Sequence, residues 1–317
     1  MNQLDPRCLD GLHQVTPRQR DGVLTIGNFD GVHLGHQRIL ATARSLADRD
    51  GLAVVAMTFE PLPEAVLQGN PPPLRLVPHE VRCRLLLRYG ADYVLTLGAD
   101  TGLLGMPPRQ FAQELVLERL APREMVEGHD FMYGRGRAGN INTLRAFGAE
   151  AGFEVHVVEP VSIELADGKR RISSTLIRQL VLKGDVAQAR LCLGRPFALY
   201  GDVIPGQGHG RVLEFPTVNI DPREQIVPLD GVYAGRARVA ERRFRAAVSI
   251  GHKLTLGPTP QRYVEAFLLD AAGDFYSQPL ELELVARLRD QQRFDGIEAL
   301  KRQIAADVEQ VRSIVQM

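Results

Sequence analysis

The first half of the chain alternates between short apolar runs and segments with helical spacing. Four apolar runs stand out: VLTI (23–26), LAVVAMTF (52–59), YVLTL (93–97) and FEVHVV (153–158). Runs without polar alternation are typical of parallel strands that are covered on both faces. After the first run, apolar residues recur at helical spacing at Ile39, Leu40, Ala43, Leu46 and Ala47. The pattern therefore predicts a Rossmann-like α/β domain with a parallel sheet and crossover helices.

Two later segments are also expected to be helical. PPRQFAQELVLERL (107–120) begins with prolines, which suit the first turn of a helix. The segment 173–194, SSTLIRQLVLKGDVAQARLCLG, is expected to form two short helices separated by Gly184. Asp185 is a possible cap for the second helix, because a short carboxylate side chain can accept a hydrogen bond from the first turn.

The pattern changes from about Tyr200 onward. Short β-rich runs broken by Gly and Pro follow one another: YGDVI, FPTVNI, GVYAGRARV, FRAAVSIG, YVEAFLLD and LELELV. This spacing predicts an antiparallel barrel or sandwich. One terminal helix is expected from about Phe294 to Val315, with one side formed by Ile297, Leu300, Ile304, Val308 and Val311. Since 317 residues are many for one core, we expect two domains, residues 1–185 and 186–317.

Composition narrows the class of protein. The chain is 44% hydrophobic and 24% charged, as in ordinary globular proteins. Its 38 basic residues balance 38 acidic ones, which gives no reason to expect nucleic-acid or membrane binding. Three widely spaced cysteines argue against a disulfide framework. Because the N-terminal region is polar and no long apolar run follows, we expect a cytoplasmic protein. Protein partners are left open.

The stretch TIGNFDGVHLGHQRIL (25–40) joins the first apolar run to the first helical segment and contains two histidines, His33 and His36. A helix that begins near Gly35 would present free backbone N–H groups and the positive end of its dipole, which favour a phosphate. Gly27, Gly31 and Gly35 would permit close approach of a ligand or positive φ. Two surface histidines or a metal-binding pair would be the alternative interpretations.

The surrounding motifs decide between these interpretations. GNFDGVHLGH resembles the HxGH signature of the nucleotidyltransferase superfamily, which binds ATP at the first strand-to-helix turn. EGHDFMYGRGRAGN (127–140) and RISSTLIRQLVLKGDVAQARLCLGRPF (171–197) are similar to two further motifs of the bacterial bifunctional riboflavin kinase and FMN adenylyltransferase family. The resemblance covers about residues 22 to 315 and implies an α/β nucleotidyltransferase domain followed by an antiparallel β-barrel kinase domain with a C-terminal helix.

The resemblance also assigns residues to the first site. It implies that ATP is bound by Gly27, Phe29, Asp30, His33, His36, Ser174, Thr175 and Arg178, of which His33, His36 and Arg178 are catalytic. Asp130, Phe131 and Gly134 are implied in flavin binding. From the residues alone, Ser173 could be a helix cap, Arg178 a surface charge and Asp30 a cap. Asp130 could equally fix the turn around Gly134.

The candidate for a second site is GQGHGRVLEFPTVNI (206–220). If PTVN enters a strand, Thr217 and Asn219 point to the same face. A hydroxyl and an amide oxygen, completed by water and phosphate, suit Mg²⁺. The segment resembles the PTxN motif of riboflavin kinases, and VEAFLLD (264–270) resembles the stretch that holds their catalytic glutamate. The resemblance thus implies Glu265 as the base, also in contact with the flavin.

The kinase motifs also contain departures. Gly208, Gly210 and Arg211 are expected near the ATP phosphates, but Glu214 stands where the family usually has glycine. Segment 249–257 lacks the usual Pro-Thr, and Arg82 in the first half replaces a frequent lysine. We therefore expect a two-step FAD synthase that uses riboflavin, FMN, ATP and Mg²⁺. A monofunctional FMN adenylyltransferase with a catalytically weak barrel, or a flavin-binding regulator, stays open.

Overall fold

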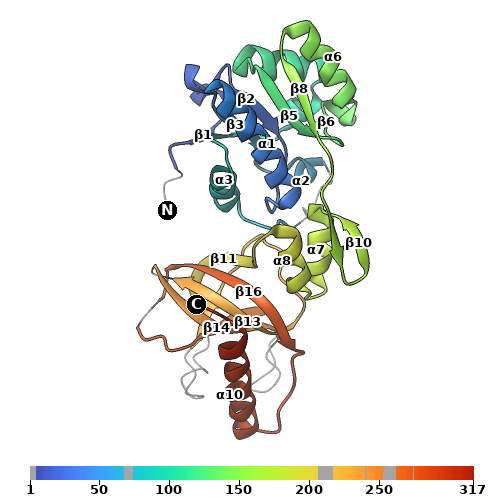
Figure 1. The fold of residues 1–317 in the computed structure, drawn as a ribbon. Coiled ribbons are helices and arrows are strands. Elements are labelled where there is room, and N and C mark those ends of the chain that lie inside the picture. Colours follow the sequence, from blue (N-terminus) through green and yellow to red (C-terminus); the bar gives the residue numbers. More distant parts are fainter. Residues whose placement is uncertain (1–4, 68–73, 206–216, 240, 253–261, 274) are drawn as a thin grey trace. The chain divides into compact units, whose positions relative to one another are not determined.

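The computed structural model describes residues 5–67, 74–205, 217–239, 241–252, 262–273 and 275–317. Contacts between Cα atoms divide the chain into two compact units. The first contains Met1–Pro73, His79–Ile163 and Lys169–Ile172, and the second contains Leu74–Pro78, Glu164–Gly168 and Ser173–Met317. Figure 1 shows the ribbon coloured along the sequence. The boundary expected at 185/186 stays a prediction, since the chain crosses between the units more than once.

The first unit is built on a parallel sheet. Its strands lie in the order β1-β4-β3-β2-β5-β8 and pair in parallel throughout. They are β1 (Cys8–Asp10), β2 (Val23–Ile26), β3 (Val54–Phe59), β4 (Tyr93–Leu97), β5 (Glu124–Gly128) and β8 (Glu154–Val158). Each residue of β2 and β3 is buried, which confirms the interpretation of the apolar runs as doubly covered strands.

Helices cover both faces of this sheet. They are α1 (Leu34–Asp50), α3 (His79–Arg88), α5 (Pro108–Phe111) with its continuation η3 (Ala112–Leu120), and α6 (Ile141–Ala151). Leu40, Ala43 and Ala47 form the buried side of α1, as their spacing predicted. On the other face, Leu24 and Ile26 of β2 pack in one core with residues of η3 and α6. The carboxyl ends of the strands are therefore followed by loops, which lie along this edge of the sheet.

Some elements of the first unit were not predicted. β1 and β5 join the sheet although their sequences, CLD and EMVEG, lack an apolar run. Glu127 in β5 is only 1% exposed, although a charged residue is expected at the surface. The smaller elements are η1 (Leu12–Gln14), η2 (Pro17–Gln19), α2 (Pro63–Leu67), α4 (Thr101–Gly105), β6 (Met132–Tyr133), η4 (Arg135–Arg137) and β7 (Gly139–Asn140).

A hairpin and two helices lie between the sheet and the barrel along the chain. β9 (Ser162–Leu165) pairs with β10 (Gly168–Arg171). α7 (Ser174–Leu182) and α8 (Val186–Leu193) flank Gly184, which has a φ of 75°. Ser173 caps α7 through the N–H of Leu176 at 3.2 Å, and Asp185 caps α8. Both caps confirm the sequence interpretation.

The second unit contains a closed barrel, with the order β11-β12-β15-β14-β13-β16. Its strands are β11 (Phe197–Ile204), β12 (Thr217–Ile220), β13 (Gly231–Val239), β14 (Arg242–Gly251), β15 (Tyr263–Leu268) and β16 (Pro279–Arg289). Neighbouring strands of the barrel pair antiparallel. The structure thus selects the barrel over the sandwich, because β11 pairs with β16 and closes the sheet.

The terminal helix α10 (Ile297–Ile314) packs on the barrel. Val308 and Val311 are buried against Ala234 of β13 and Leu269, with Phe267 and Ala247 beside them. Ile297 was expected on the same apolar side, but it is 41% exposed, because it stands at the first turn of the helix. The predicted helix is otherwise confirmed (Figure 1).

Candidate active sites

The loop between β2 and α1 has an unusual backbone. Phe29 and Val32 have φ values of 49° and 40°, in a region that non-glycine residues rarely adopt. Gly31, with φ 79°, meets the prediction that this loop needs a glycine at positive φ. The Val32 N–H donates to the carbonyl of Phe29 at 3.0 Å and closes the turn. Backbone strain of this kind is concentrated at functional sites in proteins.

His33 and His36 lie together at the start of α1. Their rings stack with centroids 3.7 Å apart and an interplanar angle of 17°. His33 is the N-cap of α1, and its Nδ1 accepts the N–H of His36 at 3.4 Å. Asp30, which could have capped the helix, therefore does not occupy that position. Because Nδ1 of His33 accepts, its proton belongs on Nε2.

His36 is neutral near pH 7. Burial lowers the pKa of His36 well below its usual value, and the neighbouring His33 adds to this effect. Among the described residues its Nδ1 is buried and has no hydrogen-bond partner. The ring of Phe29 meets the ring of His36 edge-on, with centroids 5.2 Å apart. The pair thus supplies uncharged imidazole groups at the positive end of a helix dipole.

Two glycines of this motif are explained by the histidine and phenylalanine rings. A Cβ on Gly35 would lie 3.1 Å from the His33 ring, and one on Gly27 would lie 3.1 Å from the Phe29 ring. Both contacts are tighter than almost all real Cβ contacts. In this structure the two glycines therefore make room for the protein's own rings. That they also permit close approach of a ligand stays a prediction.

Glu127 is a neighbour of this loop that the sequence analysis missed. Its Oε1 accepts the N–H of Ile26, the last residue of β2, at 2.8 Å. Burial raises the pKa of Glu127 well above its usual value, although the hydrogen bond from Ile26 acts in the opposite direction. A buried carboxyl group with a raised pKa thus adjoins the start of the strained loop. The sequence gives no clear indication of this burial, because the strand EMVEG contains a second glutamate, Glu124.

The predicted flavin residues lie around the turn after β5. Asp130 is exposed and forms an ion pair with Arg171 at 2.6 Å. The N–H of Phe131 donates to the carbonyl of Gly128 at 2.9 Å, and its ring stacks on Tyr133. Gly134 has φ 70°, and a Cβ there would lie 2.8 Å from the backbone of Pro108. Their role in flavin binding stays a prediction.

Ser174, Thr175 and Arg178 lie in the first two turns of α7, in the second unit. The Arg178 Nε donates to the carbonyl of Leu74 at 3.1 Å, within that unit. His33 and His36 belong to the first unit. A joint ATP site of these residues is therefore a prediction that rests on the ISSTxIR resemblance.

The second candidate site lies on neighbouring strands of the barrel. Thr217 and Asn219 are two residues apart on β12, and Asn219 lies opposite Glu265 of β15. The hydroxyl of Thr217 donates to Oε1 of Glu265 at 2.6 Å. Since opposite residues of an antiparallel pair share a face, the three predicted side chains are brought together.

The surroundings of Glu265 combine polar and apolar groups. Ser249 of β14 lies opposite Glu265, and its hydroxyl is 3.1 Å from that of Tyr263. The Gln291 amide donates to the same Tyr263 oxygen at 3.3 Å. Phe267, two residues along β15, packs beneath α10.

The hydroxyl oxygen of Thr217 and the amide oxygen of Asn219 are suitable ligands for Mg²⁺. Hard neutral oxygens of this kind can complete the coordination of a cation that is held mainly by phosphate oxygens. Within the described residues no group of three or more His, Cys, Asp or Glu side chains could hold a metal. Gly208, Gly210, Arg211 and Glu214, with Leu254 and Thr255, lie outside the described residues.

Fold and site geometry together define a class: a nucleotidyltransferase-type α/β domain with an HxGH loop, joined to a flavokinase-type barrel. Comparison with known families agrees. A family model described as FAD synthetase matches residues 15–176, and one described as riboflavin kinase matches residues 193–315. The chain belongs to the family of bifunctional riboflavin kinase/FMN adenylyltransferase proteins.

Relatives match over nearly the whole chain. The bifunctional riboflavin kinase/FMN adenylyltransferase of Escherichia coli strain K12 is 34% identical to this chain, and the match covers 95% of each of the two chains. That of Pseudomonas fluorescens is 35% identical, with 96% of each chain covered. A crystal structure described as a macrolide-efflux protein from Streptococcus pneumoniae has a TM-score of 0.85 at 29% identity and covers 96% of this chain and 98% of its own.

Over the described residues of the present chain, no helix has the length and apolar character needed to cross a membrane.

Proposed function

We propose that this chain makes FAD from riboflavin in two ATP-dependent steps. The barrel phosphorylates riboflavin to FMN, and the α/β domain adenylates FMN and releases pyrophosphate. The two families matched along the chain, and the names of its relatives, support this assignment. Riboflavin, FMN and ATP are the substrates, and FAD is the product.

In the adenylyl transfer, a phosphate oxygen of FMN attacks the α-phosphorus of ATP and the bond to pyrophosphate breaks. The attacking oxygen is already ionised, so no protein base is required. The reaction needs positioning and hydrogen bonds to the charge on the phosphate oxygens. The N–H of His33 Nε2, the His36 ring and the first amides of α1 are donors of this kind. Arg178 would add a cation.

The kinase reaction differs because a ribityl hydroxyl must lose its proton as it attacks the γ-phosphorus. Glu265 would take this proton through a carboxylate oxygen, and the hydrogen bond from the Thr217 hydroxyl to Oε1, which orients the carboxylate, supports this role. Bound Mg²⁺ would offset charge on the phosphates, with Thr217 and Asn219 as its protein ligands. We assign magnesium to the kinase on the chemistry of these oxygens.

The observation that supports two activities over one is the Thr217–Glu265 hydrogen bond on the barrel face. A barrel that had lost catalysis or served only as a sensor would have no need of an oriented carboxylate beside the Thr-x-Asn pair. Incubation with riboflavin, ATP and Mg²⁺ tests this directly. Accumulation of FAD supports both steps. Conversion of supplied FMN alone would establish the monofunctional alternative, and flavin binding without turnover would favour a regulator.

The cytoplasm is the compartment that we propose for this enzyme, because riboflavin and ATP would meet there. Neither nucleic acid nor a membrane is part of the proposed reaction.

A further inference from the structure

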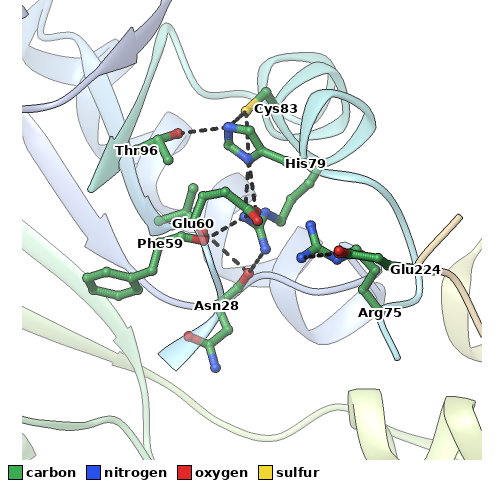
Figure 2. Close-up of polar contacts among 10 residues, drawn as sticks. Asn28, Phe59, Glu60, Arg75, His79, Cys83, Thr96 and Glu224 are labelled. Atoms are coloured by element: carbon green, nitrogen blue, oxygen red, sulfur yellow. Dashed lines mark hydrogen bonds and ion pairs between the residues drawn. The ribbon is translucent and has the colours of Figure 1, made fainter. Parts of the chain in front are cut away.

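Arg82 of α3 is a charged side chain inside the first unit. It is 0% exposed, and burial of a guanidinium is unfavourable unless its donors and its charge are matched. Its Nη2 donates to the carbonyl of Phe59 at 2.7 Å and to Oε2 of Glu60 at 2.9 Å (Figure 2). Phe59 ends β3 and Glu60 follows it. The Glu60 carboxylate compensates the charge and retains Arg82 at the carboxyl end of this strand.

The same guanidinium also reaches the loop with the paired histidines. Nη1 donates to the carbonyl of Asn28 at 3.3 Å, and the hydroxyl of Thr58 lies 3.3 Å from the same oxygen. Asn28 is the second residue after β2. Arg82 therefore connects the start of the loop to the end of the neighbouring strand.

Fixing this carbonyl restricts the most strained part of the loop. The Asn28 carbonyl belongs to the peptide plane that precedes Phe29, whose φ is 49°. Since rotation of that plane changes φ of Phe29, hydrogen bonds to the carbonyl hold the disfavoured conformation. The ring of Phe29 in turn meets the ring of His36 edge-on. A displacement at Asn28 would thus be passed to the imidazole pair.

His79 supports the guanidinium from the other side. Its Nδ1 lies 3.1 Å from Nη2 of Arg82, and its Nε2 lies 3.4 Å from the hydroxyl of Thr96 on β4. A guanidinium has donors only, so Nδ1 of His79 is the acceptor. The contacts join the ends of β2, β3 and β4 around one side chain. Such a fixed arrangement is what a preorganised phosphate site requires.

We propose that Arg82 is a positioning residue for FMN adenylylation, which holds the Asn28 carbonyl and thereby the loop that presents His33 and His36. The inference rests on the proposed adenylyl transfer and adds a residue to it. None of the described contacts of Arg82 requires it to touch a substrate. We expect Arg82 to affect the reaction through the positions of the imidazole rings of His33 and His36.

Lysine is frequent at this position in the family, but in this chain the acceptors of Asn28, Phe59 and Glu60 are arranged around a guanidinium. Arg82→Lys therefore tests this role, because lysine keeps the charge but has no planar fork that can serve the three acceptors together. The kcat/KM for FMN adenylylation should fall by roughly 10- to 100-fold, since a misplacement of about 1 Å can cost on the order of 10²-fold. The riboflavin kinase rate of the same molecules should change less than about twofold. Hydrogen–deuterium exchange should become faster in peptides that cover residues 27–37.

Arg44→Lys is the matched control. Arg44 of α1 donates to the Asp92 carboxylate at 2.6 Å and to the carbonyl of Leu52 at 3.1 Å, at the opposite end of the same sheet. This control should lower the melting temperature without selective loss of adenylylation and without faster exchange in residues 27–37. If Arg82→Lys behaves like Arg44→Lys in both readouts, or if kinase and adenylylation fall equally, Arg82 is only a structural residue.

Thr58→Val is a second variant in case Arg82→Lys does not fold. It removes the other hydrogen bond to the Asn28 carbonyl with little change in shape, and should lower adenylylation a few-fold with faster exchange at 27–37. Unchanged adenylylation and exchange would contradict the proposal. Absence of adenylylation in the unmodified protein would instead refute the proposed function, and the exchange comparison would still decide whether Arg82 holds the loop.

Discussion

The His33 ring does two things at once in the first turn of α1. It caps the helix through Nδ1 and stacks on His36, which fixes both the tautomer and the direction of the remaining N–H. His36, in contrast, keeps a buried Nδ1 without a partner among the described residues, and its pKa is lowered by burial. Of the two, His36 is therefore the ring whose removal leaves the helix cap in place.

His36→Ala should reduce FMN adenylylation by about 10²-fold or more, the usual effect of losing one preorganised donor to a developing charge. FMN formation from riboflavin should be nearly unchanged, because the kinase residues lie in the other unit. Rates of FAD formation from supplied FMN, and of FMN formation from riboflavin, measure the two effects. The exposed His13→Ala is the control, and equal loss of both activities would contradict the two-site assignment.

A second prediction at this scale concerns Glu127. Its raised pKa means that the folded state keeps a proton that the unfolded state loses above the ordinary glutamate pKa. Over that interval stability falls as pH rises, by at most about 1.4 kcal/mol per pH unit for one proton. Glu127→Gln keeps an acceptor for the N–H of Ile26 and cannot ionise.

The unfolding midpoint of Glu127→Gln should therefore exceed that of the unmodified protein increasingly as the pH rises above the ordinary pKa of a glutamate. Urea titrations of the first unit at several pH values measure the difference. The exposed Glu80→Gln should run parallel to the unmodified protein. A constant offset with pH would show that Glu127 ionises normally in the folded state.

At the scale of elements, the kinase site depends on the register of β12, β15 and β14. Asn219, Glu265 and Ser249 lie opposite one another across these strands. A shift of one residue would turn Glu265 to the buried face that Val264 and Ala266 occupy. The strand pairing and the packing of α10 on Phe267 thus hold the carboxylate in position.

Glu265→Ala should lower riboflavin phosphorylation by about 10²- to 10⁴-fold, the range for loss of a general base. Adenylylation of supplied FMN should stay within about twofold. Rates of ADP release with riboflavin and of pyrophosphate release with FMN measure the two activities. Glu309→Ala on the exposed side of α10 is the control. Normal phosphorylation in Glu265→Ala would exclude this residue as the base.

At the scale of the whole molecule, the chain combines two compact units, and the two proposed reactions use different residues. Each has its own core, one around the parallel sheet and one beneath α10. If FMN can leave the kinase and enter the other site, activity does not require both sites in one molecule.

A mixture of His36→Ala and Glu265→Ala proteins should therefore form FAD from riboflavin, with a delay while FMN accumulates in solution. Neither variant alone should form it at a comparable rate. Chromatography of the flavins over time measures FMN and FAD directly. If the mixture forms no more FAD than the two proteins measured separately, FMN does not pass between molecules, or one variant has lost both activities.

Sequence alone determined the parts of this protein that follow from local periodicity. The apolar runs of β2, β3, β4 and β8, the capped helices α7 and α8, and the alternation along β15 are visible because neighbouring residues set them. The motifs also placed His33, His36 and Glu265 correctly at the start of a helix and on a strand face. Local patterns are enough for these features.

Only the tertiary structure decided which polar groups are buried, and against what. Glu127 meets Ile26 across 101 positions of sequence, and Arg82 meets Asn28 across 54. In the sequence these residues look like surface charges, and β5 was missed for that reason. Their burial is possible because distant strand ends supply the hydrogen bonds that compensate desolvation, which is a property of the packed sheet and of no local segment.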